Sequence, residues 1–157
     1  MPSANAESKV WLTKWKSPSD IERVFSPQNW GYTSKNSEKA YYADCPTLQK
    51  YDEYYGEGNA EFWIYGQVIA LFGSSSSKDT GVVDGITVFS QSFASQVKIY
   101  KLSELMLFFA RYKAGRYDNS FSQFDARRIG NCFFKEFIPE RSKEIESCER
   151  KRKMRKH

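Results

Sequence analysis

Apolar residues recur at helical spacing through the middle of the chain. Cys45-Pro46-Thr47 is a typical helix start and Gly56 a typical helix stop, so the pattern predicts a short helix between them. A second helix is predicted to begin at Asn59 and to end at Gly73. Its apolar side chains cover most of the helix circumference, so we expect this helix to lie at the centre of the molecule.

The apolar pattern resumes after a serine-rich stretch, residues 74–81, which we interpret as a flexible loop. Apolar residues from Val82 to Tyr100 are spaced three, four or seven positions apart, which favours a helix. Glycine and β-branched residues within the segment 82–97 weaken this pattern, and a strand is the alternative.

Two further helices are indicated by their capping residues. Ser103 is a suitable N-cap for a helix that reaches Lys113 and ends at Ala114-Gly115. Asp125 is a suitable N-cap for the last strongly apolar helix. Pro139 is expected to bend or restart that helix, because proline lacks the backbone N–H that an uninterrupted helix needs.

The first 44 residues are less regular. Ser17-Pro18 has the features of a helix start, and a short helix is predicted to run through Phe25. From Ser26 to Asp44 the composition is polar, with proline, glycine and several serines, and it predicts a loop or connector. Three tryptophans could form an exposed patch that docks this arm onto the body or onto a second subunit: Trp11, Trp15 and Trp30.

Together these elements predict an all-α fold, a compact bundle of about five to six helices. We expect an N-terminal arm with a polar connector (residues 1–44), a helical domain (45–149) and a basic C-terminal tail (150–157). The 157 residues suit a single domain. Twelve Phe, ten Tyr and four Trp predict a core rich in aromatic rings.

The formal net charge of +5 comes from the end of the chain. The eight residues Arg150–His157 contain six Lys or Arg and no acid, which leaves 18 basic against 19 acidic residues in the rest. The body is therefore almost neutral. A frayed basic tail of this kind can bind phosphates without sequence preference, or can simply be a solvated terminus.

The hydropathy pattern argues against a membrane protein. No apolar stretch approaches the roughly 20 residues that a membrane span needs. The first nine residues lack the basic start and apolar stretch of a secretory signal. We expect a cytoplasmic protein that does not associate with membranes.

The residue types that most catalytic and metal sites need are scarce. The only histidine is His157, which excludes Ser-His and Cys-His pairs and a histidine-rich metal site. Cys45, Cys132 and Cys148 form no C-x-x-C pair and are expected to be free thiols. Paired acids lie in polar stretches typical of solvated helix faces. We therefore expect no enzyme, no metal site and no cofactor.

One segment combines cations with aromatic rings, a combination that suits contacts with phosphates and bases. Its residues from 111 to 128 are expected on the surface, and the candidate binding residues for a partner protein or nucleic acid are Arg111, Lys113, Gly115, Arg116, Tyr117, Arg127 and Arg128. The alternative interpretation is that the aromatic rings hold a long loop on the core while the Arg and Lys stems cover apolar surface.

Part of the chain, roughly residues 45–145, resembles a family of small proteins of unknown activity that are carried on conjugative elements and prophages of Bacteroidota. The resemblance is carried by Tyr100–Tyr117, Phe124-Asp125, Phe134–Arg141, Cys45–Leu48 and Glu61–Trp63. The order of helices is also similar to the small helical domains of phage helicase loaders.

Two functions follow as hypotheses. The first is a non-enzymatic accessory protein of a mobile genetic element that binds another protein, in DNA replication or transfer. The conspicuous turn Lys113–Tyr117 on a body without catalytic residues motivates it. The alternative is a nucleic-acid-binding protein that uses the basic and aromatic segment together with the tail. The sequence identifies neither the partner nor the oligomeric state.

Overall fold

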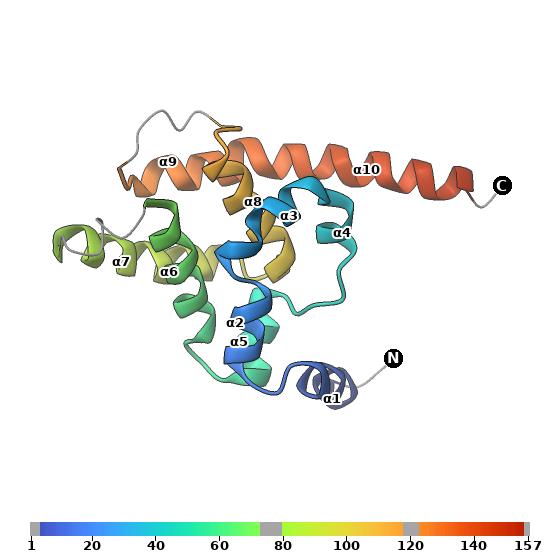
Figure 1. Ribbon diagram of the computed structural model, residues 1–157, viewed down its shortest axis with the longest axis horizontal. Helices are drawn as coiled ribbons and strands as arrows, with labels where there is room; N and C mark the ends of the chain where they lie inside the picture. Colours follow the sequence, from blue (N-terminus) through green and yellow to red (C-terminus); the bar gives the residue numbers. More distant parts are fainter. Residues whose placement is uncertain (1–3, 73–79, 118–122, 156–157) are drawn as a thin grey trace.

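The computed structural model describes residues 4–72, 80–117 and 123–155, and these residues form an all-α fold, as predicted (Figure 1). The first half contains α1 (Ala4–Lys14), α2 (Pro18–Val24), the 3-10 turn η1 (Pro27–Asn29), α3 (Trp30–Lys35), α4 (Ser37–Tyr42), α5 (Leu48–Tyr55) and α6 (Asn59–Phe72). The second half contains α7 (Thr80–Gln96), α8 (Leu102–Lys113), α9 (Ala126–Asn131), the π-helical segment η3 (Cys132–Phe137) and α10 (Ile138–Arg155).

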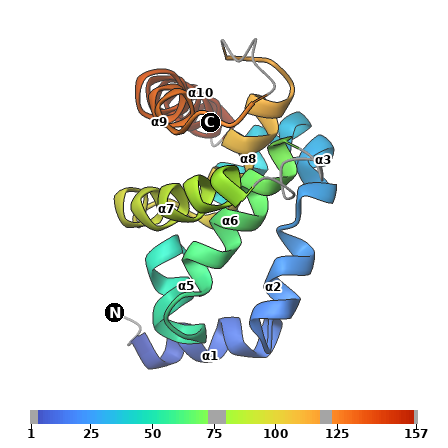
Figure 2. The same cartoon turned by 90° about the vertical axis from the view of Figure 1, so that its left-hand side faces the viewer.

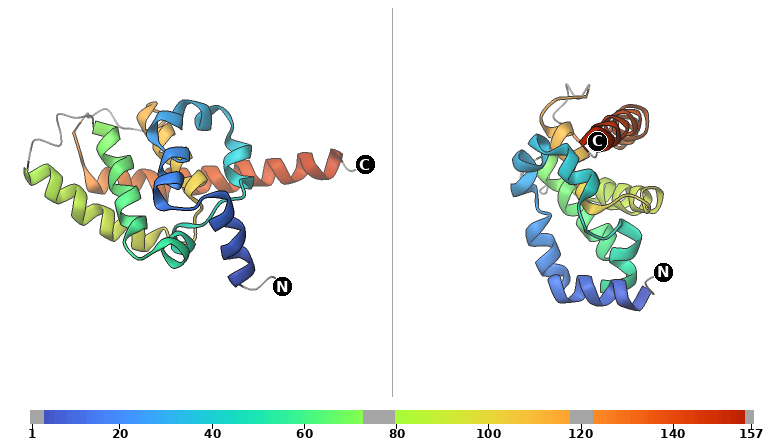
Figure 3. Two further views of the ribbon diagram at one scale, coloured as in Figure 1. Left: turned by 60° about the horizontal axis from the view of Figure 1, so that its bottom comes forward. Right: turned by 90° about the vertical axis from the view of Figure 1, so that its right-hand side faces the viewer.

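The shorter helices form a layered body, and α10 lies along one side of it and extends beyond it (Figures 1 and 3). Figure 2 shows α10 almost end-on above α7 and α6, with α1 at the opposite end of the molecule. Helices α6 and α7 pack against each other, and α3, α4 and α6 pack against α8. None of the described helices has both the length and the apolar character that crossing a bilayer requires.

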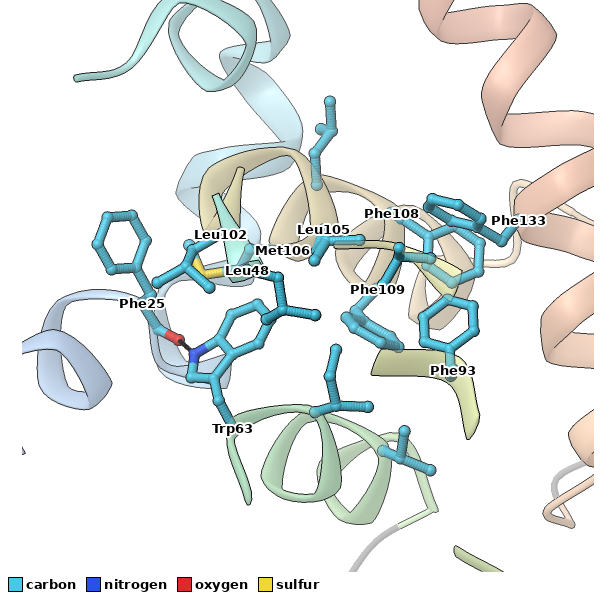
Figure 4. Close-up of a cluster of buried hydrophobic side chains, with 14 of the residues drawn as sticks. Phe25, Leu48, Trp63, Phe93, Leu102, Leu105, Met106, Phe108, Phe109 and Phe133 are labelled. Atoms are coloured by element: carbon cyan, nitrogen blue, oxygen red, sulfur yellow. Dashed lines mark hydrogen bonds between the residues drawn. The ribbon is translucent and has the colours of Figure 1, made fainter. Parts of the chain in front are cut away.

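Helix α8, and not α6 as expected, is the centre of the core. Every residue from Leu102 to Tyr112 is buried, so the helix is covered on all sides. Figure 4 shows its side chains pointing toward different neighbours, with Phe93 and Phe133 near one end and Trp63 near the other. Phe108 meets Phe133 edge-to-face, with 5.1 Å between ring centroids. The predicted aromatic core is therefore confirmed.

A buried hydrogen-bond network joins the N-terminal helices to α6. The indole Nε1 of Trp30 donates to Gln67 Oε1 at 2.7 Å, and the amide of Gln67 donates to the carbonyl of Phe25 at 3.0 Å. The indole Nε1 of Trp63 donates to the same carbonyl (Figure 4). Trp11 and Trp15 are also buried, so the tryptophans line the core and form no exposed patch.

The predicted loop over residues 26–44 is wrong, because this segment forms η1, α3 and α4. Its helices are short and polar in composition, and isolated helices of this length are unstable in water. Packing against α8 stabilises them, with Trp30, Ala40 and Tyr41 buried. A local pattern of apolar residues could not reveal that support.

Several predicted helix boundaries are confirmed. The side chains of Ser17, Thr47 and Asp125 each accept a hydrogen bond from a backbone N–H in the first turn of the helix that follows. Gly56 ends α5 with a φ of 119°, a conformation that disfavours residues with a Cβ. The helical interpretation of residues 82–97 is confirmed by α7, which ends at Gln96.

Other boundaries differ from the prediction. Helix α8 begins two residues earlier than expected, with Lys101 in place of Ser103 as N-cap, and the backbone N–H of Lys101 donates to the carboxylate of Glu104 at 3.0 Å. The Ser103 hydroxyl instead donates to the carbonyl of Ala40 at 2.6 Å. The expected disturbance at Pro139 is present as η3, where the i→i+5 pattern precedes the proline.

The predicted helix stop at Gly73 lies outside the described residues. Most of the predicted serine-rich loop 74–81 does too, and only its residues 80 and 81 are described, as part of α7. The expected frayed tail is wrong for residues 150–155, since α10 continues through Arg155. The last two residues of the tail are likewise outside the described part.

Candidate functional site

Five of the seven candidate binding residues lie at the end of α8 and in the turn after it: Arg111, Lys113, Gly115, Arg116 and Tyr117. Gly115 has a φ of 83°, its N–H donates to the carbonyl of Tyr112, and the N–H of Arg116 donates to the carbonyl of Arg111. This pair of bonds is a Schellman C-cap. The turn brings Arg116 and Tyr117 to the side of Arg111.

These side chains meet two glutamates of α10. Arg111 pairs through one guanidinium nitrogen with Glu140 and through another with Glu144, the latter at 2.9 Å. Arg116 Nε lies 2.7 Å from Glu140 Oε2, and the hydroxyl of Tyr117 donates to Glu140 Oε1 at 2.8 Å. We call Arg111, Arg116, Tyr117, Glu140 and Glu144 the arginine cluster.

The expectation that Arg111 lies on the surface is wrong, because Arg111 is only 4% exposed. Tyr117 is buried too, and its ring stacks on Phe108 with centroids 5.9 Å apart. From α4, the hydroxyl of Tyr41 also donates to Glu144. The aromatic residue of the turn therefore holds it on the core, as the second interpretation of this segment expected.

The phenols of Tyr41 and Tyr117 and the guanidinium of Arg111 have shifted pKa values in this environment. Burial raises the pKa of Tyr41, and the hydrogen bond to Glu144 raises it further. Burial and the contact with Glu140 raise the pKa of Tyr117 in the same way. Burial alone would lower the pKa of Arg111, but Tyr41 and the two glutamates outweigh it and the net shift is upward. These phenols stay neutral and Arg111 stays charged near neutral pH.

The other candidate residues lie elsewhere. The ammonium of Lys113 donates to the carbonyl of Leu71 at 2.9 Å. Arg127 and Arg128 belong to α9 and line a separate depression of about 290 Å³. Asp125 and Glu136 line the same depression, so its charges are mixed in sign. The candidate side chains are thus distributed over three places.

An apolar groove that the sequence did not predict lies where the end of α2, α3, α4 and α8 meet. Its volume is about 350 Å³, and we call it the α3–α4 groove. Its lining residues are Val24, Phe25, Asn29, Tyr32, Thr33, Asn36, Lys39, Ala40, Ser103 and Met106.

The rim of the α3–α4 groove exposes large hydrophobic side chains. Tyr32 is 61% exposed and Val24 is 42% exposed. The ammonium of Lys39 lies 3.1 Å from the Tyr32 hydroxyl and 5.6 Å from the ring centroid. Among the described residues Lys39 has no carboxylate partner. The groove therefore combines an apolar floor with an available cation.

No group of three metal-binding side chains converges within the described ranges. A second, more polar groove of about 630 Å³ is lined by several acids of α5 and α6 and by Lys98. One of these acids, Asp52, is occupied, because its carboxylate accepts the N–H of Ala60 at 2.7 Å. That contact caps the start of α6.

Comparison of the chain with protein-family models, with curated proteins and with solved structures gives no match. The connection to mobile elements of Bacteroidota stays a prediction.

Proposed function

We propose that this chain is a non-enzymatic accessory protein of a mobile genetic element, which acts in the cytoplasm by binding another protein in DNA replication or transfer. The α3–α4 groove is the observation that supports the proposal. Its volume of about 350 Å³ lies within the usual range of about 300–1,000 Å³ for ligand pockets. An open apolar groove between helices suits a helix or an extended segment of a partner.

The exposed apolar side chains at the groove support the same proposal. Covering Val24 and the ring of Tyr32 with a partner would remove apolar surface from water, at roughly 25 cal/mol per Å². A large aromatic side chain that is mostly exposed beside an apolar groove resembles the anchors of protein interfaces. The arginine cluster offers no comparable site, because its charges are already paired.

The proposal can be tested with a photoreactive amino acid in place of Tyr32 and, as the control, in place of Val88 on α7, which is 64% exposed. We expect a specific cross-linked partner at position 32 that is missing at position 88. The purified partner should then bind the variants Val24→Gln and Tyr32→Ala more weakly than the wild type. Identical adducts at both positions would count against the groove as the binding site.

Nucleic-acid binding is the second candidate, and the end of α10 favours it. The last turns carry Arg150, Lys151, Lys153 and Arg155, all exposed, and extend beyond the body (Figure 3). Lysine and arginine on a projecting helix can contact phosphates. By contrast, Arg111 and Arg116 are neutralised by Glu140 and Glu144.

Binding to double-stranded DNA at about 50 mM and about 200 mM salt tests this candidate. Substituting Lys151 and Lys153 with glutamine should reduce affinity and flatten the salt dependence. The matched control is the pair Arg127→Gln and Arg128→Gln on α9. Equal loss in both variants would contradict a site at the end of α10.

A further inference from the structure

The residues that line the α3–α4 groove also indicate which kind of partner segment can bind there. We propose that its occupant is an acidic, apolar segment of the partner protein, with an apolar side chain on the floor and a carboxylate on Lys39. This inference depends on the protein-binding function proposed above and specifies the partner's binding segment.

The floor of the groove has no free hydrogen-bond donor to offer. The Thr33 hydroxyl donates to the carbonyl of Asn29 at 3.0 Å, and the Ser103 hydroxyl donates to the carbonyl of Ala40. The other buried residues of the lining are Phe25, Ala40 and Met106. A polar side chain placed there would lose its water without adequate replacement. The floor therefore selects an apolar side chain.

The rim of the α3–α4 groove determines which sign of charge the partner segment should carry. Lys39 is the only ionisable group among the lining residues apart from the phenol of Tyr32. Its ammonium has three donor hydrogens, and Tyr32 accepts one of them. The remaining donors are available to a carboxylate, whereas a cation at the same place would be repelled.

The neighbouring acid on α4 does not compete for Lys39. Glu38 is paired instead with Arg152 of α10, at 3.3 Å. The side-chain amides at the rim are also engaged, because Asn29 donates to the carbonyl of Val24 and Asn36 donates to the carbonyl of Tyr32. Lys39 is thus the rim group best placed to recognise a charge on the partner.

A phage-displayed library of short random peptides, selected on the full chain, tests this inference with defined probes. Groove-dependent peptides are those whose binding is weakened by both Val24→Gln and Tyr32→Ala. We expect these peptides to combine Asp or Glu with large apolar residues. Lys39→Glu should weaken them about five- to tenfold, the loss expected for reversing one exposed charge contact.

Lys143→Glu on the exposed face of α10 is the matched control, and it should leave the affinity of these peptides unchanged. Selection on the Lys39→Glu variant should in turn yield peptides with Lys or Arg beside the apolar residues. Circular dichroism of each variant verifies that the fold is retained.

The outcomes separate the inference from the proposed function. Groove-dependent peptides without acids, or with affinity insensitive to Lys39→Glu, would overturn the inference and leave protein binding intact. A library that yields no groove-dependent peptide would overturn both. Groove-dependent self-association of the pure chain would show that a second copy is the occupant, which also contradicts the proposal.

Discussion

Arg111 is almost fully buried and still keeps its charge, because two carboxylates and a phenol surround its guanidinium group. The two glutamates are partly exposed, at 22% and 27% of their side chains, so water stabilises them from the outer side. The arrangement allows a buried cation without burying two isolated anions. Its stability depends on all partners being present.

Replacing Arg111 with methionine should destabilise the protein by about 2–4 kcal/mol, because the glutamates lose their partner and the packing of the guanidinium is only partly replaced. Arg116→Met is the matched control. Its side chain is 48% exposed, and the loss should stay below about 1 kcal/mol. Urea unfolding measures both variants. Equal losses would contradict the central position of Arg111.

Gly115 is the other residue on which the arginine cluster depends. Its positive φ of 83° should make Gly115→Ala cost about 1–2 kcal/mol, because a Cβ is strained in this conformation. Gly130→Ala in α9 has open space around the added Cβ and should be neutral or stabilising by up to about 1 kcal/mol. Thermal unfolding compares the two, and an equal effect would argue against strain.

At the scale of elements, α10 is unusual because none of its 18 residues is buried. Polar contacts hold much of α10. The glutamates of the arginine cluster lie near its start, Arg141 pairs with Glu104 at 2.8 Å, and Arg152 pairs with Glu38 nearer its end. Exposed ion pairs are weak and are screened by salt. We therefore expect the far end of α10 to be held less firmly than its start.

High salt should loosen α10 from its far end. At about 1 M NaCl the screening length falls to about 3 Å, so the exposed Arg152–Glu38 pair should weaken before the buried pairs of Arg111. Hydrogen exchange should then accelerate in residues 146–155 and remain slow in α8. Unchanged protection at the end of α10 would mean that apolar contacts hold it.

Alkaline pH should weaken the contacts that Tyr41 and Tyr117 make with the glutamates of α10. Tyr41 and Tyr117 have a raised pKa in the folded state, above the ordinary value of 10.0, so the folded state binds these protons more tightly. Their contribution is complete below about pH 10 and is lost as the pH rises above it. Tyr41→Phe should reduce the fall in stability between about pH 10 and about pH 12, measured by urea unfolding. An unchanged fall would contradict this role.

At the scale of the whole molecule, the N-terminal segment shares the core of the rest. Trp11, Trp15 and Trp30 are buried together with residues of α6 and α8 in one cluster. Gln67 of α6 joins Trp30 to the carbonyl of Phe25. This sharing predicts cooperative unfolding of the first 44 residues with the remainder.

Tryptophan fluorescence can monitor the unfolding of the N-terminal segment, because three of the four tryptophans lie within residues 1–44. In a urea titration, tryptophan fluorescence should follow the N-terminal segment, and far-ultraviolet circular dichroism should follow all helices. We expect coincident transitions. A fluorescence transition at lower urea would instead support the division into an arm and a separate helical domain.

The sequence by itself determined the fold class and those helices whose ends carry strong local signals. Thr47, Gly56 and Asp125 act through bonds or backbone angles within a few residues, so their effect can be read locally. The spacing of apolar residues likewise favoured the helix that the structure shows as α7.

Only the tertiary structure decided which polar groups are free and which are paired. Arg111 meets glutamates 29 and 33 positions away, and no local pattern specifies such a pairing. The helices α3 and α4 depend on packing against α8, and the α3–α4 groove exists only because those elements meet. Short-range hydrogen bonds and side-chain periodicity are properties of the sequence, whereas burial and charge pairing depend on residues that folding brings together.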